Sequence, residues 1–215
     1  MVRSFDIERL FNYTDGMARK IGSHSSTTGP KVREAAVRLM YRHGYAAVSM
    51  RQIAADVGVQ AGALYTYTPD KQSLLFDLLH DHMTEVLEAA AVETDTLLEP
   101  VARLDRLTRF HIRHHVPRRE VVFLSYMELR NLSPGNFAII DSQRQSYEAI
   151  FEEALRDGVT SGVFTTPDPK VASVALIAML NGICNWYRPD GRLTLDEIET
   201  MYVGMVRGAV GCISG

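Results

Sequence analysis

Two histidine sets are the residues of this sequence whose types and spacing could perform catalytic chemistry. His111 and His115 are four residues apart, a spacing that puts both imidazoles on one face of a helix and occurs in zinc sites. His80-Asp81 resembles the pair found in metal-dependent phosphohydrolases. Neither set has a further ligand at a defined spacing. We therefore assign both sets a structural or solvated role, expect no metal or cofactor, and keep an all-α metal-dependent hydrolase as a distant alternative.

A second kind of chemistry, the recognition of DNA, is indicated by residues 49–71. Ser49 and Gln52 have the spacing of a capping box, so a helix is expected to start directly after Ser49. Gly58 can take the left-handed conformation of a sharp turn, and a second helix is expected from Gln60 to about Tyr67. Two short helices joined in this way predict a helix-turn-helix, whose second helix enters a DNA major groove.

The second helix of this motif carries small outward residues, which would let its backbone approach phosphates. A third helix is expected from Pro69 with Thr68 as its cap, and the lysine in its first turn would provide an anion site. Gln60 and Thr66 would contact base edges, while the arginine, tyrosine and lysine side chains would contact phosphates. The candidate DNA-binding residues are Arg51, Gln60, Ala61, Gly62, Ala63, Tyr65, Thr66, Tyr67 and Lys71.

Composition and charge agree with this hypothesis. The 215 residues are 46% hydrophobic, enough for a real core, and the net charge is −3. Residues 1–80 contain ten Lys and Arg and seven Asp and Glu, so they carry +3 and the remaining residues −6. The positive charge is thus concentrated where the motif lies.

Cysteine usage and hydropathy indicate the compartment. Cys184 and Cys212 are too few for a disulfide framework, which favours a reducing cytoplasm. The first residues lack the apolar run of a signal peptide, and no apolar stretch has membrane-spanning length. We expect a soluble cytoplasmic protein without membrane association.

Helical periodicity dominates the chain, and no segment shows the sustained two-residue alternation of a strand. The expected fold is all-α, with a three-helix unit followed by a larger helical bundle. We predict an N-terminal arm (1–29), a helix-turn-helix domain (30–76) and a ligand-binding and dimerisation domain (77–215). Arg19 and Lys20 of the arm could touch DNA, although a solvated tail is the better explanation. Nine helices are expected, at 30–43, 50–57, 60–67, 69–94, 99–115, 118–131, 136–161, 169–187 and 195–211.

The larger bundle is interpreted as a sensor of a small hydrophobic molecule. Its helices contain aromatic and methionine side chains, which line apolar pockets as well as ordinary cores. Polar residues within these apolar helices need partners, and a ligand is one candidate. The candidate ligand-binding residues are Arg106, Phe110, His114, Phe123, Tyr126, Met127, Arg130, Tyr147, Phe151, Asn181, Asn185 and Trp186.

A two-fold dimer is expected because residues 169–187 are apolar nearly all round, more than one buried face requires. Its interface would involve this helix and residues 147–161. Two-fold symmetry would place two recognition helices on a palindromic DNA site. The candidate interface residues are Leu155, Val171, Val174, Ala175, Ala178, Met179, Ile183 and Tyr187.

The segment Ser49–Ala54 with Gly58-Val59, Gly62-Ala63-Leu64-Tyr65 and Pro69–Leu75 resembles the DNA-binding domain of TetR-type transcriptional regulators. The resemblance covers about residues 31–79, and Thr68 departs from it where the family has an aromatic residue. The resemblance implies that the protein is a repressor which a ligand releases from operator DNA, and that it is not an enzyme.

The sequence segments 128–134 and 185–194 are similar to the corresponding segments of TetR-type regulators of fatty-acid or steroid breakdown, some of which sense acyl-CoA thioesters. A CoA head would need cations, and an arginine run on one expected helix could supply them or could be a solvated face. The alternative is a TetR-type sensor of hydrophobic drugs that controls efflux. The arginine run consists of Arg103, Arg106, Arg109 and Arg113.

Overall fold

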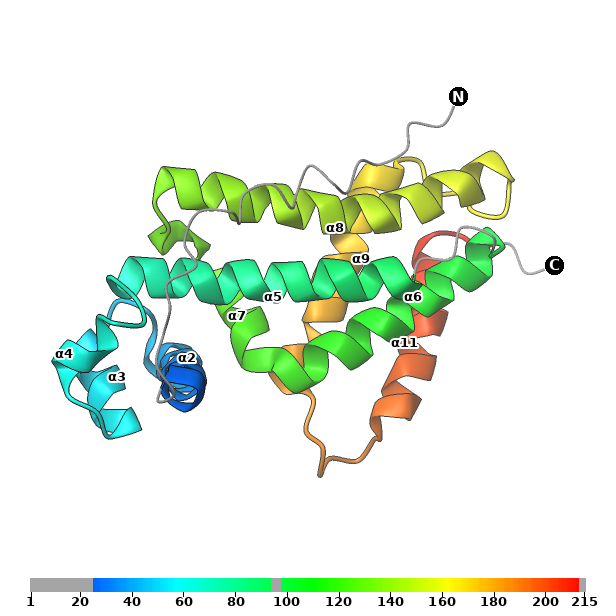
Figure 1. Cartoon of the computed structure of the whole chain (residues 1–215). Coiled ribbons are helices and arrows are strands. Elements are labelled where there is room, and N and C mark those ends of the chain that lie inside the picture. Colours follow the sequence, from blue (N-terminus) through cyan, green and yellow to red (C-terminus); the bar gives the residue numbers. More distant parts are fainter. Residues whose placement is uncertain (1–24, 94–97, 213–215) are drawn as a thin grey trace.

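The computed structural model describes residues 25–93 and 98–212, and the regular elements within these ranges are all helical (Figure 1). The prediction of an all-α fold is confirmed. The candidate arm residues Arg19 and Lys20 lie outside the described ranges. The elements are α2 (Ser25–His43), α3 (Met50–Val57), α4 (Ala61–Leu64), α5 (Lys71–Glu93), α6 (Pro100–His115), the 3-10 turn η1 (Val116–Arg118), α7 (Arg119–Met127), the 3-10 turn η2 (Leu129–Asn131), α8 (Pro134–Thr160), α9 (Pro169–Asn181), α10 (Ile183–Trp186) and α11 (Leu195–Ala209).

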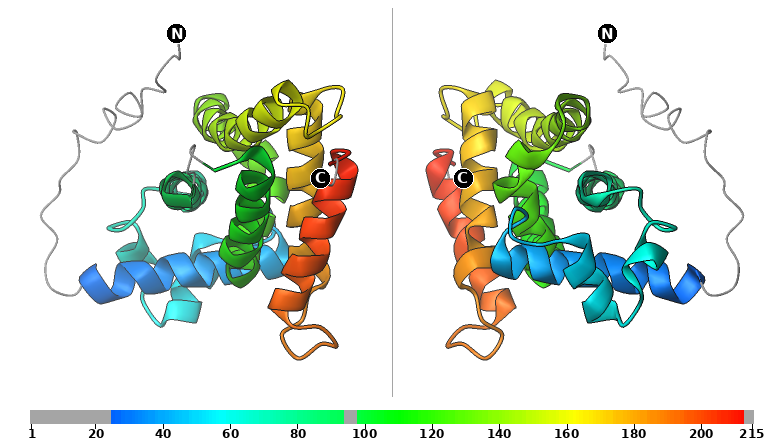
Figure 2. Two further views of the ribbon diagram at one scale, coloured as in Figure 1. Left: turned by 90° about the vertical axis from the view of Figure 1, so that its right-hand side faces the viewer. Right: turned by 90° about the vertical axis from the view of Figure 1, so that its left-hand side faces the viewer.

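The helices form two parts that α5 connects. α2, α3 and α4 gather at one end of α5, and α8 runs beside α5 in the larger part (Figure 1). Seen along α5, helix α6 lies between α5 and the pair α9 and α11, which form the outer side (Figure 2). None of the described helices is long and apolar enough to cross a membrane.

Local sequence signals explain the motif end of the molecule. Ser49 accepts a hydrogen bond from the Gln52 backbone N–H, and the Gln52 side chain accepts from the Ser49 N–H, so the capping box of α3 is formed. Gly58 has a φ of 78°, which favours glycine, and it ends α3 as predicted. Ile53 and Ala54 are buried where α3 packs on α2.

Two expectations near the motif need correction. The helix expected from Gln60 to about Tyr67 is only one turn long. It ends at Leu64 as α4, and residues 65–67 form a turn. The cap of α5 is Asp70 and not Thr68, since the Asp70 carboxylate accepts the Ser73 N–H at 2.7 Å. Thr68 instead fills a buried position and donates its hydroxyl to the Asp70 carbonyl.

Other helix boundaries also differ from the expected ones. α2 begins at Ser25, so Pro30 lies inside it and not at its first position. The expected helix at 169–187 is divided into α9 and α10 at Gly182, where a Cβ would lie 3.1 Å from the Met179 carbonyl oxygen. The expected helix at 118–131 ends as an α-helix at Met127 and continues as a 3-10 turn.

Candidate nucleic-acid interface and effector cavity

The helix-turn-helix motif presents a surface of small side chains to solvent. Leu64 is the buried residue of α4, whereas Gly62 and Ala63 are exposed, and a Cβ added to Gly62 would meet nothing within 4 Å. A helix with so little side-chain bulk can approach a phosphate chain with its backbone. This agrees with the expected role of α4, although the helix is shorter than predicted.

Most candidate DNA-binding residues lie on this surface. Arg51, Gln60 and Thr66 are exposed, and Tyr65 is 56% exposed. The Thr66 hydroxyl donates to the Ala63 carbonyl at 2.7 Å, so its oxygen is left as an acceptor for a base N–H group. Ala61 and Tyr67 are half-buried beneath the surface.

Lys71 has a structural role that the sequence did not predict. Its ammonium donates to the Tyr45 carbonyl at 2.9 Å and to the Val48 carbonyl at 2.7 Å, and it lies 4.2 Å from the centre of the Tyr45 ring. These contacts hold the loop between α2 and α3 against the start of α5. They engage the ammonium in intramolecular bonds, and its contact with a phosphate stays a prediction.

Replacing Lys71 with methionine is expected to lower the free energy of unfolding by about 2 kcal/mol, because two charge-assisted hydrogen bonds are lost and two loop carbonyls lose their donor. Urea denaturation at one fixed protein concentration measures the change. Lys170→Met is the matched control, since Lys170 forms surface ion pairs with Glu148 and Glu152 that contribute less than about 1 kcal/mol. Equal losses in the two variants would contradict the structural role of Lys71.

The same loop is held from the larger part of the molecule by Glu128. The buried Glu128 carboxylate, which follows α7, accepts the Tyr45 N–H at 3.1 Å and the Asn131 side-chain amide at 2.6 Å. Tyr41 of α2 also packs edge-on against Phe123 of α7, with ring centres 5.1 Å apart. The loop after α2 therefore contacts both α5 and the end of α7, so a shift of either helix reaches the motif.

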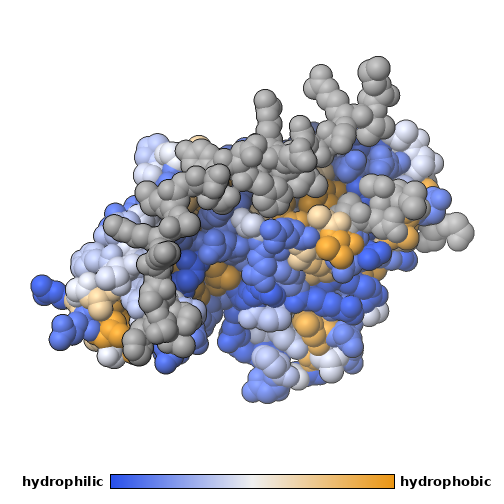
Figure 3. Space-filling view, viewed as in Figure 1, coloured by the Kyte–Doolittle hydropathy of each residue, from blue (hydrophilic) through white to orange (hydrophobic). Residues whose placement is uncertain are grey.

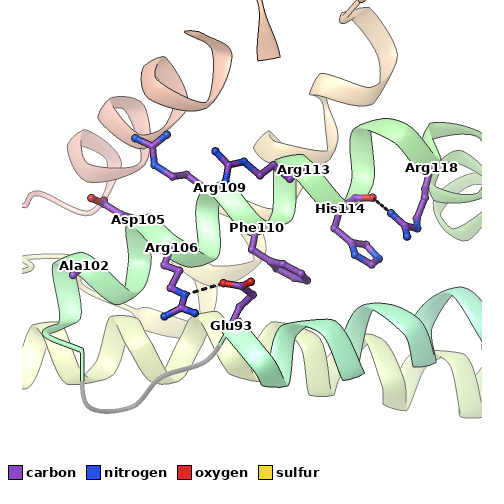
Figure 4. A pocket seen from close by; sticks show the side chains of 9 residues that line it. All are labelled: Glu93, Ala102, Asp105, Arg106, Arg109, Phe110, Arg113, His114 and Arg118. Carbon is purple, nitrogen blue, oxygen red and sulfur yellow. Dashed lines mark hydrogen bonds and ion pairs between the residues drawn. The ribbon is translucent and has the colours of Figure 1, made fainter. Parts of the chain in front are cut away.

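The larger part contains a cavity of about 630 Å³ beside α6 (Figure 4). Phe110 and His114 point into the space between α6 and α5, whereas Arg109 and Arg113 extend from the other side of α6 toward α11. The face seen in Figure 3 is mostly hydrophilic, with separate hydrophobic patches. The cavity is lined by Glu93, Ala102, Asp105, Arg106, Arg109, Phe110, Arg113, His114 and Arg118.

The arginine run is neither an unpaired cation cluster nor a merely solvated face. Arg103 is buried, and its two terminal nitrogens pair with Glu153 and Asp157 of α8 at 2.8 and 2.9 Å. Arg106 donates its Nε to Glu93 at 2.8 Å. Arg103 thus belongs to the packing of α6 on α8, and Arg106 belongs to the cavity wall.

The other two arginines of the run meet one buried carboxylate. Glu199 of α11 is fully buried, and it accepts hydrogen bonds from the Arg113 Nε at 2.7 Å and from the Arg109 Nη1 at 3.4 Å. This contact raises the pKa of the Arg113 guanidinium. The Arg109 and Arg113 side chains are 38% and 60% exposed, and they attach α11 to α6. Both residues also belong to the lining of the cavity.

Of the twelve candidate ligand residues, the structure brings only Arg106, Phe110 and His114 together at this cavity. Glu93 and Arg118 were missed, because Glu93 is the last residue of α5 and Arg118 is the last residue of η1. The remaining candidates lie elsewhere. Phe123 packs on Tyr41, whereas Phe151, Tyr147 and Asn181 are buried in the core. The other candidates are exposed, and they are Tyr126, Met127, Arg130, Asn185 and Trp186.

Tyr147 and Asn181 belong to a hydrogen-bonded core network around His111. The Asn181 Oδ1 accepts from the His111 Nε2 at 3.3 Å, because the Asn181 amide nitrogen donates to the Tyr126 hydroxyl. The His111 Nδ1 is therefore the acceptor of the Tyr147 hydroxyl at 2.9 Å. Burial lowers the pKa of His111 to about 3 and raises that of Tyr147, so both groups are neutral.

The histidine sets lack the arrangement of a metal site. The His111 and His115 rings are stacked with centres 3.9 Å apart, and the His115 Nδ1–H donates to the His111 carbonyl. Asp81 pairs with Arg33 at 2.5 Å and lies 3.8 Å from the His80 Nδ1. Within residues 25–93 and 98–212, no group of three or more His, Cys, Asp or Glu could hold a metal ion.

The candidate dimer residues divide into two groups. Leu155 and Ile183 are fully buried in the protein's own core, so their assignment to an interface was wrong. Both residues belong to the hydrophobic core cluster of their own bundle. Met179 and Tyr187 are half-buried. The exposed members all lie on α9 and are Val171 (64%), Val174 (45%), Ala175 and Ala178.

This apolar surface continues onto α11, which the sequence interpretation did not include. Met201 and Met205 are 45% and 54% exposed, and Gly204 and Gly208 each have open space where a Cβ would stand. α9 and α11 lie side by side on the outer side of the molecule (Figure 2). We call the exposed apolar residues of these two helices the α9–α11 face.

Comparisons with known proteins agree with both parts of the structure. Residues 32–78 match the family of bacterial regulatory proteins named tetR, and residues 97–210 match the tetracyclin repressor-like C-terminal domain. The HTH-type transcriptional repressor KstR2 of Mycobacterium tuberculosis (strain ATCC 25618 / H37Rv) is 27% identical over 199 residues, which cover 90% of this chain and 98% of KstR2.

Two solved structures are similar over most of their length. A tetR-family regulatory protein from Rhodococcus RHA1 has a TM-score of 0.82 and 27% identity, covering 87% of this chain and 99% of its own. AibR in complex with isovaleryl coenzyme A and operator DNA has a TM-score of 0.76 and 29% identity, covering 86% of this chain and 100% of its own.

Proposed function

The chain belongs to the tetR family of bacterial regulatory proteins, and on that basis we propose that it is a ligand-responsive transcriptional repressor which a small molecule releases from operator DNA. The observation that carries this proposal is the exposed α4, which presents small residues at one end of the molecule and is followed directly by the half-exposed Tyr65. Such a surface fits a major groove and its flanking phosphates. A catalytic role for the histidines is not proposed, since their rings are stacked or buried without a metal-ligand set among the described residues.

We propose an acyl-CoA thioester as the effector. The cavity combines the aromatic ring of Phe110 with the guanidinium groups of Arg106 and Arg118, as a ligand with an apolar part and an anionic part requires. The similar protein AibR has been solved with isovaleryl coenzyme A. A sensor of hydrophobic drugs would have no need of the arginines, so that alternative is not favoured.

Release requires that the effector bind the DNA-incompetent arrangement more tightly than the competent one. The cavity lies between α6 and α5, and α5 begins at the motif. A ligand that displaces α5 would move Lys71, whose ammonium holds the α2–α3 loop. Glu128 offers a second route, because it bonds the same loop from the end of α7.

The experiment that tests the function is a screen for operator release. The operator is first located by footprinting, and release is then followed by fluorescence anisotropy with acyl-CoAs, free acids and hydrophobic drugs. We expect release by acyl-CoAs without product formation in the same samples. Release by drugs alone would refute the acyl-CoA effector, turnover would revive an enzymatic function, and the lack of a preferred DNA site would refute the repressor itself.

We also propose that the repressor is a two-fold dimer joined through the α9–α11 face. A helix pair with exposed valines and methionines loses unfavourable water contact when a second copy covers it. Two copies related by a two-fold axis would place both α4 helices on one face of a palindromic operator.

The substitution Val174→Glu is expected to convert the dimer to a monomer, because it places a charge in the centre of an apolar interface. Sedimentation at micromolar concentration should then give the 24.1 kDa mass of one chain in place of about twice that value. Val92→Glu is the matched control, since Val92 is 78% exposed at the end of α5 and lies outside the α9–α11 face. A wild-type mass near that of one chain, or a dimeric Val174→Glu variant, would contradict the proposed interface.

A further inference from the structure

Two arginines of α6 share one buried carboxylate. The Glu199 Oε1 accepts from the Arg113 Nε at 2.7 Å, and its Oε2 accepts from the Arg109 Nη1 at 3.4 Å. A fully buried carboxylate is stable only when it is paired, so Glu199 keeps both guanidinium groups near the same point. The two arginines are four residues apart on α6, which puts their side chains on one face of that helix.

Most donors of these two guanidinium groups are not used within the described part of the chain. A guanidinium group has five N–H donors. Arg109 donates a hydrogen bond only through its Nη1, and Arg113 only through its Nε. The Arg113 Nη2 lies 3.9 Å from an Asp196 carboxylate oxygen, which is too far for a hydrogen bond. The two side chains are 38% and 60% exposed, so a ligand has access to them.

The same cavity borders both sides of α6. Its lining includes Phe110, which points into the space between α6 and α5, and also Arg109 and Arg113, which extend toward α11 (Figure 4). Its volume of about 630 Å³ is in the range of small-molecule sites. A ligand that occupies the whole cavity therefore meets an aromatic ring on one side of α6 and two guanidinium groups on the other.

The acidic residues around the arginine pair leave it with excess positive charge. Glu199 supplies one negative charge to two guanidinium groups. Asp105, which also lines the cavity, forms an ion pair with Arg207 of α11. Asp196 is 90% exposed, so solvent screens its charge. Such a pair attracts an anion, and phosphate oxygens match the planar fork of a guanidinium group especially well.

We propose that Arg109 and Arg113 form an anion subsite that holds the phosphate groups of the effector. The proposal rests on the acyl-CoA function proposed above, and it assigns the two ends of such a ligand to opposite sides of α6. The acyl part lies beside Phe110, and the phosphates lie beside α11. The same two arginines then attach α11 to α6 and recognise the effector.

The test compares octanoyl-CoA with octanoyl-pantetheine, which carries the same acyl thioester but no phosphate. Release of the full-length wild-type protein from its operator is titrated with each compound, and the ratio of the two concentrations at half release is measured. We expect octanoyl-pantetheine to need an about 30-fold higher concentration, because each of two charge-assisted contacts contributes about fivefold. A ratio near one would overturn the subsite and leave the acyl-CoA repressor standing.

Two variants locate the effect. Arg109→Gln removes one guanidinium group while Arg113 stays bonded to Glu199, so the fold is retained and the ratio should fall to about fivefold. The double variant Arg109→Gln with Arg113→Gln should lower the ratio to about onefold. A general loosening of α11 would change both concentrations alike, so it would leave the ratio unchanged.

Arg207→Gln is the matched control for these variants. Arg207 also attaches α11 to α6, through its ion pair with Asp105, but it does not line the cavity. Its ratio should stay at about 30-fold. An unchanged ratio in the double variant would limit Arg109 and Arg113 to the attachment of α11 and overturn the subsite. If neither compound releases the wild-type protein, the effector class itself fails, and the subsite with it.

Discussion

Replacing Ala63 with glutamate should lower the affinity of this repressor for its operator by at least about 100-fold, because it places a carboxylate against the DNA phosphates. Ala63 is exposed on α4, the helix that is proposed to enter the major groove. The fold should tolerate the change, since the neighbouring Gly62 also has open space around it. Fluorescence anisotropy at several salt concentrations measures the loss.

The control for this experiment is Ala138→Glu. Ala138 is exposed on α8, so the substitution changes the net charge by the same amount far from the motif in sequence. Its operator affinity should stay within about twofold of the wild type. If Ala63→Glu binds the operator as well as Ala138→Glu does, α4 is not the recognition helix.

A second large effect is expected from acid, because two core histidines must be neutral in the folded state. The pKa is lowered to about 4 for His82 and to about 3 for His111, in both cases mainly by burial. In the unfolded chain a histidine has a pKa of about 6.5. The unfolded state therefore binds more protons below pH 6.5, and the folded state loses stability as the pH falls.

Between pH 7 and pH 5 each of these two groups costs about 2 kcal/mol, so together they lower the free energy of unfolding by roughly 4 kcal/mol. His114 and His115 act in the same direction, since burial lowers their pKa too. Glu85 and Arg118 are the charged groups near His82, and their effects on its pKa oppose each other. Urea denaturation at each pH, with a fixed protein concentration, measures the loss.

His82→Phe should reduce the acid-dependent loss by about 2 kcal/mol, because one buried titrating group is removed. His43→Gln serves as the control, since His43 lies exposed at the end of α2. The range from pH 7 to pH 5 lies above the usual pKa of carboxylates, so the protonation of histidines dominates the change in stability over this range. A stability that is flat between pH 7 and pH 5 would show that the core accepts charged imidazoles.

The features that sequence analysis predicted well are those that neighbouring residues determine. The Ser49 capping box and the left-handed Gly58 depend on residues within one turn of the chain. The all-α fold followed from periodicity, because an apolar stripe such as that of α5 repeats along a single element.

The features that were missed depend on partners far along the chain. Arg109 and Arg113 lie about 90 residues before Glu199, so their ion pairs could not be inferred from the spacing of the arginines. The candidate ligand residues Tyr147 and Asn181 were chosen as polar or aromatic members of apolar helices, yet they meet His111 in the core. Lys71 was assigned to a phosphate because its acceptors, two loop carbonyls, have no signature in side-chain sequence.

The contact between Glu128 and Tyr45 has a consequence for how much effector the cell must supply. If one bistable connection transmits effector binding to the motif, DNA and effector must weaken each other by the same factor, since the two orders of binding lead to the same complex. A molecule already seated on its operator is then a poorer sensor than a molecule free in solution. The effector concentration that clears the operator exceeds the dissociation constant of the free protein, and it rises with the affinity of the operator.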